Sequence, residues 1–310
     1  MGKGGVEIPM LRRCFLLEQA RNHDSRGSAF WSENAAIQLA TQTVTTKDYS
    51  AAREPADHER TSLLSFPVLD AKPRRGRSLA TLPGVRHPFW TYVCGVLVSF
   101  VVIAALSILT GLLITHIALR VRWLADDDER LVRFLAHHRS GSLTEASLVG
   151  SIMAGGVVLP IIAGIAATIA AVAKHWRLAG FLLFALAVES GSYRATTMVV
   201  HRHRPEVHRL ENLQVDASYP SGHTAASIAI YWGIALLLTS RTSNVAARIC
   251  IWTVAVLIPV YVAFSRMYRG MHHPLDIAGG VVVGIAALSA MVLVSRAADV
   301  RSSMHGSAPK

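Results

Sequence analysis

Charged residues are absent from long stretches of this 310-residue sequence. No Asp, Glu, Lys or Arg occurs in five windows of 17 to 32 residues, at 88–119, 146–173, 224–240, 249–265 and 277–295. A membrane-spanning helix needs about 20 predominantly apolar residues. A sixth window, 178–200, is apolar except for Glu189 and Arg194. A large soluble protein could bury such helices, but so many uncharged stretches leave almost nothing to form its surface. The sequence therefore predicts an all-α, polytopic membrane protein with six transmembrane helices.

Cysteine and acidic residues are both scarce. The three cysteines, Cys14, Cys94 and Cys250, are scattered without CxxC spacing, which argues against a disulfide framework and against a cysteine metal site. Lys and Arg number 31 against 20 Asp and Glu, which gives a net charge of +11. The basic residues are spread over the chain ends and short loops, so the positive-inside bias of membrane proteins explains them better than nucleic-acid binding.

Polarity divides the chain into three parts. Residues 1–86 are polar and mixed in charge, and we expect a mostly disordered cytoplasmic tail there. The first 30 residues lack the compact apolar core and small-residue cleavage site of a signal peptide. Residues 87–297 are the predicted six-helix membrane domain, and 298–310 a short cytoplasmic tail.

Loop charges predict the orientation. Segment 120–145 holds five Arg and five acidic residues, whereas 174–177, 241–248 and the C-terminal segment are basic. With six spans, these basic segments and the N-terminal tail fall on one side, so we expect both termini to be cytoplasmic and the protein to lie in the cell (inner) membrane. Two histidine-rich segments, 201–223 and 265–276, then share the exoplasmic side. We expect an active site there, at the helix ends.

Three clusters carry the candidate chemistry: HRHRPEVHR (201–209), YPSGHTAAS (219–227) and SRMYRGMHHPLD (265–276). They combine guanidinium groups, which grip anions through paired donors, with imidazoles able to act as nucleophile or acid. Few carboxylates accompany them, which argues against a hard divalent cation. Pro274 suits a first helical position, and Asp276 in the first turn could fix the tautomer of a preceding imidazole. This geometry does not choose between His272 and His273.

These clusters resemble the type-2 phosphatidic acid phosphatase superfamily. Its pattern is Lys-x6-Arg-Pro, then Pro-Ser-Gly-His, then Ser-Arg-x5-His-x3-Asp. The second motif is complete at 220–223 and the third at 265–276, with His272 at the histidine position. The first is partial: Arg204 and Pro205 are present, but Thr197 stands at the lysine position. Arg202, or less favourably Arg194 with its possible partner Glu189, could replace the missing cation.

The resemblance implies a fold, a reaction and a role for each matching residue. His272 would be the nucleophile that forms a phosphohistidine, Asp276 would orient it, and His223 would protonate the leaving oxygen and then activate water. The phosphoryl oxygens would be held by Arg204, Arg266, Ser221 and the Gly222 amide. No metal or other cofactor is implied.

The predicted substrate is a membrane lipid phosphate or diphosphate. Undecaprenyl diphosphate, phosphatidate and phosphatidylglycerol phosphate all fit, and the sequence does not separate them. One alternative is a non-hydrolytic lipid-phosphate binding or transport protein on the same scaffold, which the Thr197 departure makes conceivable. Another is a vanadate-dependent oxidant, which the transmembrane frame disfavours.

Overall fold

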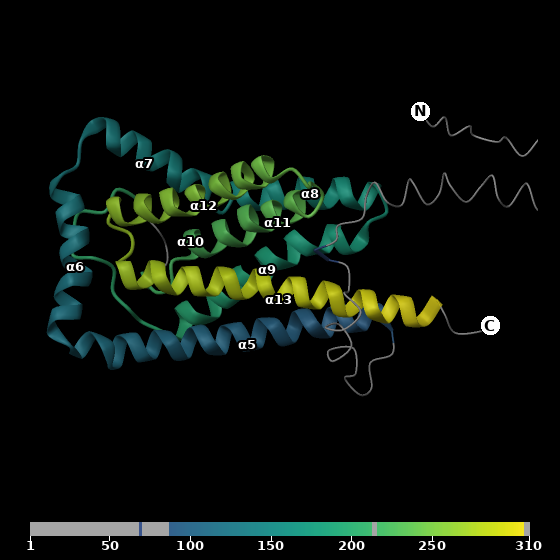
Figure 1. Ribbon diagram of the computed structural model, residues 1–310. Helices are drawn as coiled ribbons and strands as arrows, with labels where there is room; N and C mark the ends of the chain where they lie inside the picture. Colours follow the sequence, from purple (N-terminus) through teal and green to yellow (C-terminus); the bar gives the residue numbers. More distant parts are fainter. Residues whose placement is uncertain (1–67, 70–86, 213–215, 307–310) are drawn as a thin grey trace, which may run out of the picture. The chain divides into compact units, whose positions relative to one another are not determined.

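The computed structural model describes residues 68–69, 87–212 and 216–306, with side chains described up to residue 300. All of them belong to one compact unit, Ser65–Lys310. This part of the chain is helical throughout and contains no strand (Figure 1). The long helices are α5 (Pro88–His116), α6 (Arg122–His137), α7 (Gly141–Met153), α8 (Val158–Val172), α9 (Trp176–Val199), α12 (Val245–Tyr268) and α13 (Pro274–Gly306). Shorter helical segments are η2 (Ala118–Arg120), α10 (Gly222–Ser227), η3 (Ile228–Trp232) and α11 (Gly233–Thr239).

Five helical stretches in the described residues are long and apolar enough to cross a membrane: Pro88–Arg120, Gly141–Val172, Gly222–Thr239, Val245–Tyr268 and Pro274–Val300. Large apolar side chains such as Leu97, Val101 and Val260 are more than half exposed on them, which suits contact with hydrocarbon rather than water. The all-helical fold and the five uncharged windows are therefore confirmed as the frame of a multi-pass membrane protein.

The sixth predicted span corresponds to α9. It has 24 residues, but Glu189, Arg194 and several hydroxyl side chains make it more polar than the other five. α9 packs against α5, α8 and α13, and it buries 11 of its residues. Polar groups are thus placed inside the bundle, where other side chains can contact them. The count of six spans stays a prediction.

Two predicted helix boundaries differ from those in the structure. The window 146–173 is interrupted between Met153 and Val158, where α7 ends and α8 begins. No charged residue in this window marks the break, but non-helical backbone at membrane depth is tolerated where it lines a cavity. At the other end of the chain, α13 continues to Gly306, so the predicted tail 298–310 begins as helix.

The predicted N-terminal tail lies almost wholly outside the described residues. Its two described residues are packed rather than disordered. Leu69 is buried in the apolar core, and the carbonyl of Val68 accepts a hydrogen bond of 2.9 Å from Nε of Arg296 in α13. The predicted tail otherwise lies outside the described residues and stays a prediction.

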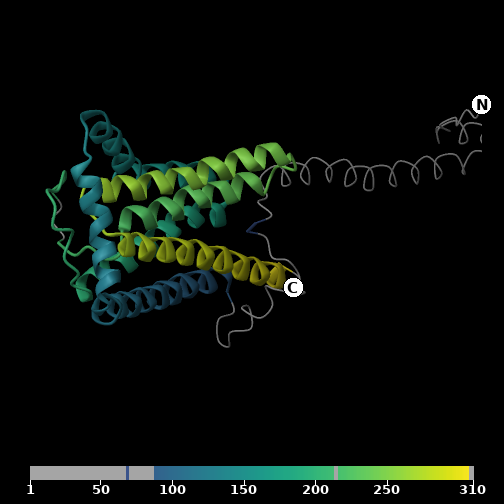
Figure 2. The same ribbon diagram turned by 60° about the vertical axis from the view of Figure 1, so that its left-hand side comes forward.

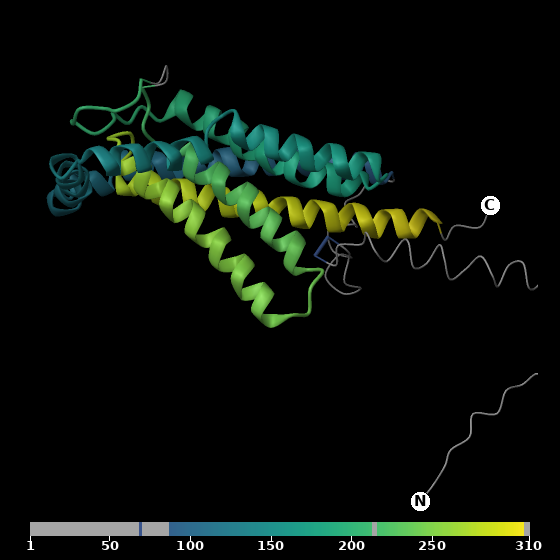
Figure 3. The same cartoon turned by 90° about the horizontal axis from the view of Figure 1, so that it is seen from above.

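α6 and the two histidine-rich segments lie at the same end of the helix bundle. α6 lies across the ends of α5, α12 and α13 there, roughly perpendicular to them (Figures 1 and 2). The α12–α13 turn and the segment between α9 and α10 lie at the same end, and Figure 3 shows α12 and α13 meeting at their turn and diverging away from it. The histidine-rich segments, far apart in sequence, are therefore neighbours in space.

Candidate active site

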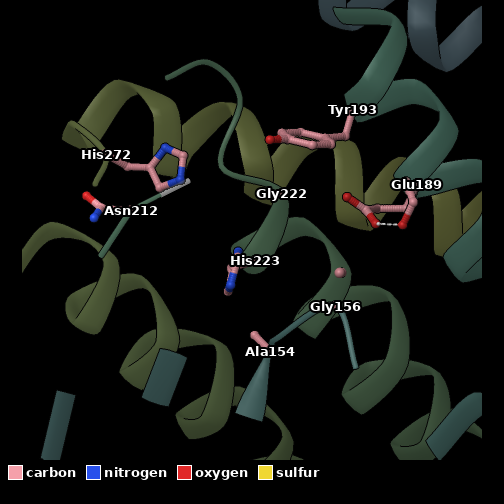
Figure 4. Close-up of a pocket in the computed structure, with 10 residues that line it drawn as sticks. Ala154, Gly156, Glu189, Tyr193, Asn212, Gly222, His223 and His272 are labelled. Atoms are coloured by element: carbon pink, nitrogen blue, oxygen red, sulfur yellow. Dashed lines mark hydrogen bonds between the residues drawn. The ribbon is translucent and has the colours of Figure 1, made fainter. Parts of the chain in front are cut away.

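A cavity of about 450 Å³ opens beside the two histidine-rich segments (Figure 4). His272, at the α12–α13 turn, and His223, in the first turn of α10, both line it. Gly222 lines it too, and its N–H is among the first of its helix, which have no carbonyl within the helix to bind. The remaining lining residues are Ala154, Gly156, Glu189, Ser190, Tyr193, Asn212 and Ala226.

The α12–α13 turn depends on one glycine. Gly270 has φ of +72°, a conformation that side-chain-bearing residues rarely adopt, and a Cβ there would lie 2.7 Å from Cγ2 of Val207. α12 ends shortly before it, at Tyr268, and α13 begins at Pro274, as the sequence predicted. The short segment between the two helices carries His272 into the cavity wall.

His272 is held by the other histidine-rich segment. Its Nδ1 lies 2.7 Å from the carbonyl oxygen of Ser218, so Nδ1 carries the proton and Nε2 keeps its lone pair. Burial first, and then the positive charge of Arg266, keep the pKa of His272 well below its usual value. The imidazole is therefore neutral near pH 7, as a nucleophile must be.

Asp276 does not bind His272 directly, contrary to the predicted orienting contact. Its Oδ2 lies 3.9 Å from Nδ1 of His272, and it instead accepts hydrogen bonds from the hydroxyl of Ser218 at 2.5 Å and the amide of His273 at 2.8 Å. Hydrogen bonds therefore connect Asp276 to His272 through Ser218, whose carbonyl accepts the Nδ1 proton of His272. No motif in the sequence pointed to Ser218.

His273 is the histidine that Asp276 contacts. Its Nδ1 is 3.2 Å from Oδ2 of Asp276 and its Nε2 is 2.9 Å from Oε2 of Glu129 in α6. Both ring nitrogens thus face carboxylates, and His273 is not among the cavity-lining residues. The structure separates two histidines that the sequence pattern alone left equivalent.

Arg266 is fully buried and has one vacant pair of donors. Its Nη1 donates to the hydroxyl of Ser151 and, over 2.7 Å, to Oε2 of Glu211. Its Nε and Nη2 have no hydrogen-bond partner among the described residues. These two nitrogens form one edge of the guanidinium, which matches two oxygens of a phosphoryl group.

Glu211 shares its carboxylate between Arg266 and Arg269. Burial raises the pKa of this carboxyl, but the charge and hydrogen bonds of Arg266, with a further bond from Arg269, outweigh burial and lower the pKa to about 2. Glu211 is therefore ionised near pH 7. It fixes the Arg266 side chain by binding Nη1, which leaves the opposite edge, Nε and Nη2, available for a ligand. Sequence analysis missed this residue.

Like Arg266, the predicted phosphate ligands Arg204 and Ser221 are buried and are not among the residues that line the cavity. Arg204 donates to the carbonyl oxygens of Met271 over 2.5 Å and of Ala217 over 3.1 Å. Ser221 hydrogen-bonds Thr224 through its hydroxyl and the carbonyl of Asp276 through its amide. These contacts join the two histidine-rich segments.

Arg202 does not replace the missing lysine. It is buried, with Nη1 2.5 Å from Oδ1 of Asp276 and Nη2 in close contact with Oδ2 of Asp128 in α6. A guanidinium held between two carboxylates stabilises the fold and presents no vacant donor pair to a phosphate. Thr197 is buried as well, and its hydroxyl donates to the carbonyl of Arg194.

The comparisons with known proteins bear on the same segment. Residues 178–299 match the PAP2 superfamily. This match confirms the resemblance to type-2 phosphatidic acid phosphatases and includes both histidine-rich segments. The N-terminal part of the chain and α5 to α8 lie outside the matched PAP2 residues.

Two curated relatives match shorter stretches. The chain is 36% identical over 93 residues to the undecaprenyl-diphosphatase BcrC of Bacillus subtilis. This stretch makes up 29% of this chain and 43% of BcrC. The chain is 39% identical over 75 residues to an undecaprenyl-diphosphatase of Sulfolobus acidocaldarius, which is 24% of this chain and 32% of the relative. The matched stretches thus span less than half the length of these relatives.

One solved structure has the same fold. It is the crystal structure of the first transmembrane PAP2 type phosphatidylglycerolphosphate phosphatase from Bacillus subtilis, with 19% identity and a TM-score of 0.51. The similarity covers 73% of this chain and 99% of that chain. It therefore extends the fold assignment beyond the matched PAP2 residues.

The sequence predicts the acidic run of α6 as part of a neutral loop, but in the structure it anchors the candidate site. Besides Arg202, Asp128 binds the amide of Leu275 in the first turn of α13 over 2.9 Å. We expect Asp128→Asn to lower the free energy of unfolding by roughly 3 kcal/mol, because removing one partner of a buried ion pair leaves an uncompensated charge. Thermal unfolding in detergent would measure the change.

Asp127→Asn is the matched control on the same helix. Its pair with Arg130 is solvent-exposed, and such pairs contribute about 1 kcal/mol or less. Equal shifts in unfolding temperature for the two variants would contradict the anchoring role of Asp128.

Proposed function

We propose that this protein is an integral membrane phosphatase that hydrolyses a lipid phosphate or diphosphate. The vacant donor pair of buried Arg266, near the cavity that His272 and His223 line, carries the proposal. A buried cation with two unpaired donors is costly unless an anion binds it. The names of the relatives support a lipid phosphate as that anion.

The proposed reaction begins with attack by Nε2 of His272 on the phosphorus atom. The bond to the leaving oxygen breaks as the phosphohistidine forms, and His223 gives that oxygen a proton. In the second step His223 takes a proton from water, which attacks the phosphohistidine and releases inorganic phosphate. In this proposal Nε and Nη2 of Arg266 hold two phosphoryl oxygens, and the Gly222 amide holds a third.

Asp276 acts in this proposal through Ser218 rather than by direct contact. It fixes the Ser218 hydroxyl, and the Ser218 carbonyl holds the proton on Nδ1 of His272. Arg204 and Ser221 position the two segments, and Arg204 also places positive charge near the phosphate. Arg202 is left out of the phosphate-binding set because its donors are bound to carboxylates.

The proposed topology follows the loop charges. Six spans, with α9 as the third, would place both termini in the cytoplasm of a cell with an inner membrane and the cavity on the exoplasmic side. The lipid chain would stay in the bilayer while the head group enters the cavity. Labelling a cysteine introduced at His208, which is exposed, from outside intact cells tests this orientation.

The decisive experiment is phosphate release by purified protein from a panel of isoprenyl diphosphates, phosphatidate and phosphatidylglycerol phosphate. A phosphatase releases phosphate from at least one of them. A non-hydrolytic binder would retain the lipids without release, and that result would exclude the enzyme.

Removal of metal ions should leave the rate unchanged. The proposed chemistry uses arginine, histidine and backbone donors to stabilise the phosphoryl charge, so no step requires a divalent cation. Phosphate release measured before and after EDTA treatment checks this. Loss of activity with EDTA, restored by added Mg²⁺, would contradict the metal-independent mechanism.

A further inference from the structure

Glu189 is a buried acid on the cavity wall that the proposed mechanism does not use. It lies in α9, is 1% exposed, and lines the cavity together with His272 and His223 (Figure 4). One carboxyl oxygen, Oε2, accepts a hydrogen bond of 2.9 Å from the hydroxyl of Ser190. The other, Oε1, has no hydrogen-bond partner among the described residues.

No cation among the described residues forms an ion pair with this carboxyl. The sequence suggested Arg194 as its partner, but no ion pair joins Arg194 to Glu189 in the described part of the chain. Burial without a counter-ion disfavours the charged form of a carboxyl. As a neutral acid, Glu189 offers one donor and one vacant acceptor to whatever enters the cavity.

The neighbours of Glu189 connect it to Gly222 and His223 on the cavity wall. Ser190 and Tyr193 are on the same helix and also line the cavity. The Tyr193 ring packs against Gly222, where a Cβ would lie 3.1 Å from it, and Gly222 directly precedes His223. In Figure 4, Glu189 and His272 lie on opposite sides of Gly222. The cavity thus has a second polar wall beyond the catalytic histidines.

We propose that Glu189 and Ser190 form a subsite for the second, non-reacting phosphate of a lipid diphosphate. The subsite rests on the proposed phosphatase function. The terminal phosphorus bonds to Nε2 of His272, its bond to the bridging oxygen breaks, and His223 protonates that oxygen. The lipid monophosphate that leaves is held by a hydrogen bond from the neutral Glu189 carboxyl to its phosphate, with Ser190 beside it.

A neutral acid is the right donor at this position. An ionised carboxylate would repel the phosphate, whereas a protonated carboxyl, kept neutral by burial without a counter-ion, donates a strong hydrogen bond to an anion. A lipid monophosphate has no second phosphate to receive this bond. Glu189 should therefore set the preference for diphosphates over monophosphates with the same chain.

The test compares kcat/KM for an isoprenyl diphosphate and for the isoprenyl monophosphate of the same chain length. We expect Glu189→Ala to lower the diphosphate value by about 10- to 100-fold, the effect of losing one hydrogen bond to a charged group, and to leave the monophosphate value unchanged. Glu189→Gln should retain the wild-type preference, because its amide keeps the size and a donor.

Ser192→Ala is the matched control. Ser192 is buried in α9, and its hydroxyl also lacks a hydrogen-bond partner among the described residues, but it does not line the cavity. We expect it to change neither value. Thermal unfolding of each variant checks that the fold is retained.

Three outcomes of this comparison, and a fourth with another lipid, would overturn the subsite while leaving the phosphatase proposal intact. The three are an equal loss on both substrates in Glu189→Ala, no loss on either, and a Glu189→Gln variant as impaired as Glu189→Ala. If Glu189→Ala lost kcat/KM on phosphatidylglycerol phosphate alone, Glu189 would instead bind a glycerol hydroxyl, and the diphosphate subsite would also be overturned. Wild-type protein that releases phosphate from no lipid would overturn the proposed function itself, and the subsite with it.

Discussion

Replacement of His272 by alanine should reduce phosphate release by about three orders of magnitude or more. The imidazole is the proposed nucleophile, and enzymes that lose their nucleophile retain only the catalysis due to binding and charge stabilisation. The adjacent His273 is held by Asp276 and Glu129 and does not line the cavity, so it is not positioned to replace His272. Initial rates with the best lipid of the substrate panel measure the loss.

Two histidine variants provide the comparison. His203 is exposed in the segment between α9 and α10, and His203→Ala should keep wild-type activity. His273→Ala should affect stability more than chemistry, because His273 bridges Asp276 and Glu129 away from the cavity. Activity retained in His272→Ala but lost in His273→Ala would reverse the assignment of the nucleophile.

Arg266→Lys should lower kcat/KM by about 100-fold. Lysine keeps a positive charge beside Glu211, which also retains its ion pair with Arg269. It cannot reproduce the paired donors Nε and Nη2, which are the proposed contacts to two phosphoryl oxygens. A loss of this size is typical when one preorganised donor to a transition-state oxygen is removed.

Weaker inhibition by inorganic phosphate should accompany the loss in Arg266→Lys, because product and substrate share the same donors. Arg209→Lys is the control, since Arg209 pairs with Asp216 in an exposed salt bridge. If Arg266→Lys kept the wild-type kcat/KM, the paired-donor geometry would be irrelevant and the site would need only a charge.

The sequence was most informative about elements whose signal is local. Uncharged windows located five of the apolar helical stretches, and Pro274 marked the start of α13, because helix formation and membrane insertion depend on nearby residues. Two complete motifs identified His272 and His223, which the structure brings to one cavity. Thr197 was correctly noted as a departure from the pattern.

Pairings between distant segments could not be read in the same way. The acids of α6 were counted as loop charge, yet Asp128 is bound to Arg202, 74 residues away. The same pairing removes Arg202 from the predicted phosphate ligands. Glu211 and Ser218 carry no motif, and their importance comes from the side chains they meet in the folded chain. The α7–α8 break carries no charge; its local signals are Gly155-Gly156 and Pro160 in the first turn of α8, and they lie inside an uncharged window that reads as one continuous span.

The position of α6 has a consequence for local unfolding. Through Asp128 it is tied to Arg202 after α9 and to the first turn of α13, and through Glu129 to His273. All three connections start from two adjacent residues of α6, so a movement of this helix away from the bundle breaks them together. We expect this end of the bundle to open as one cooperative unit, with a free energy set by the whole network rather than by its weakest loop.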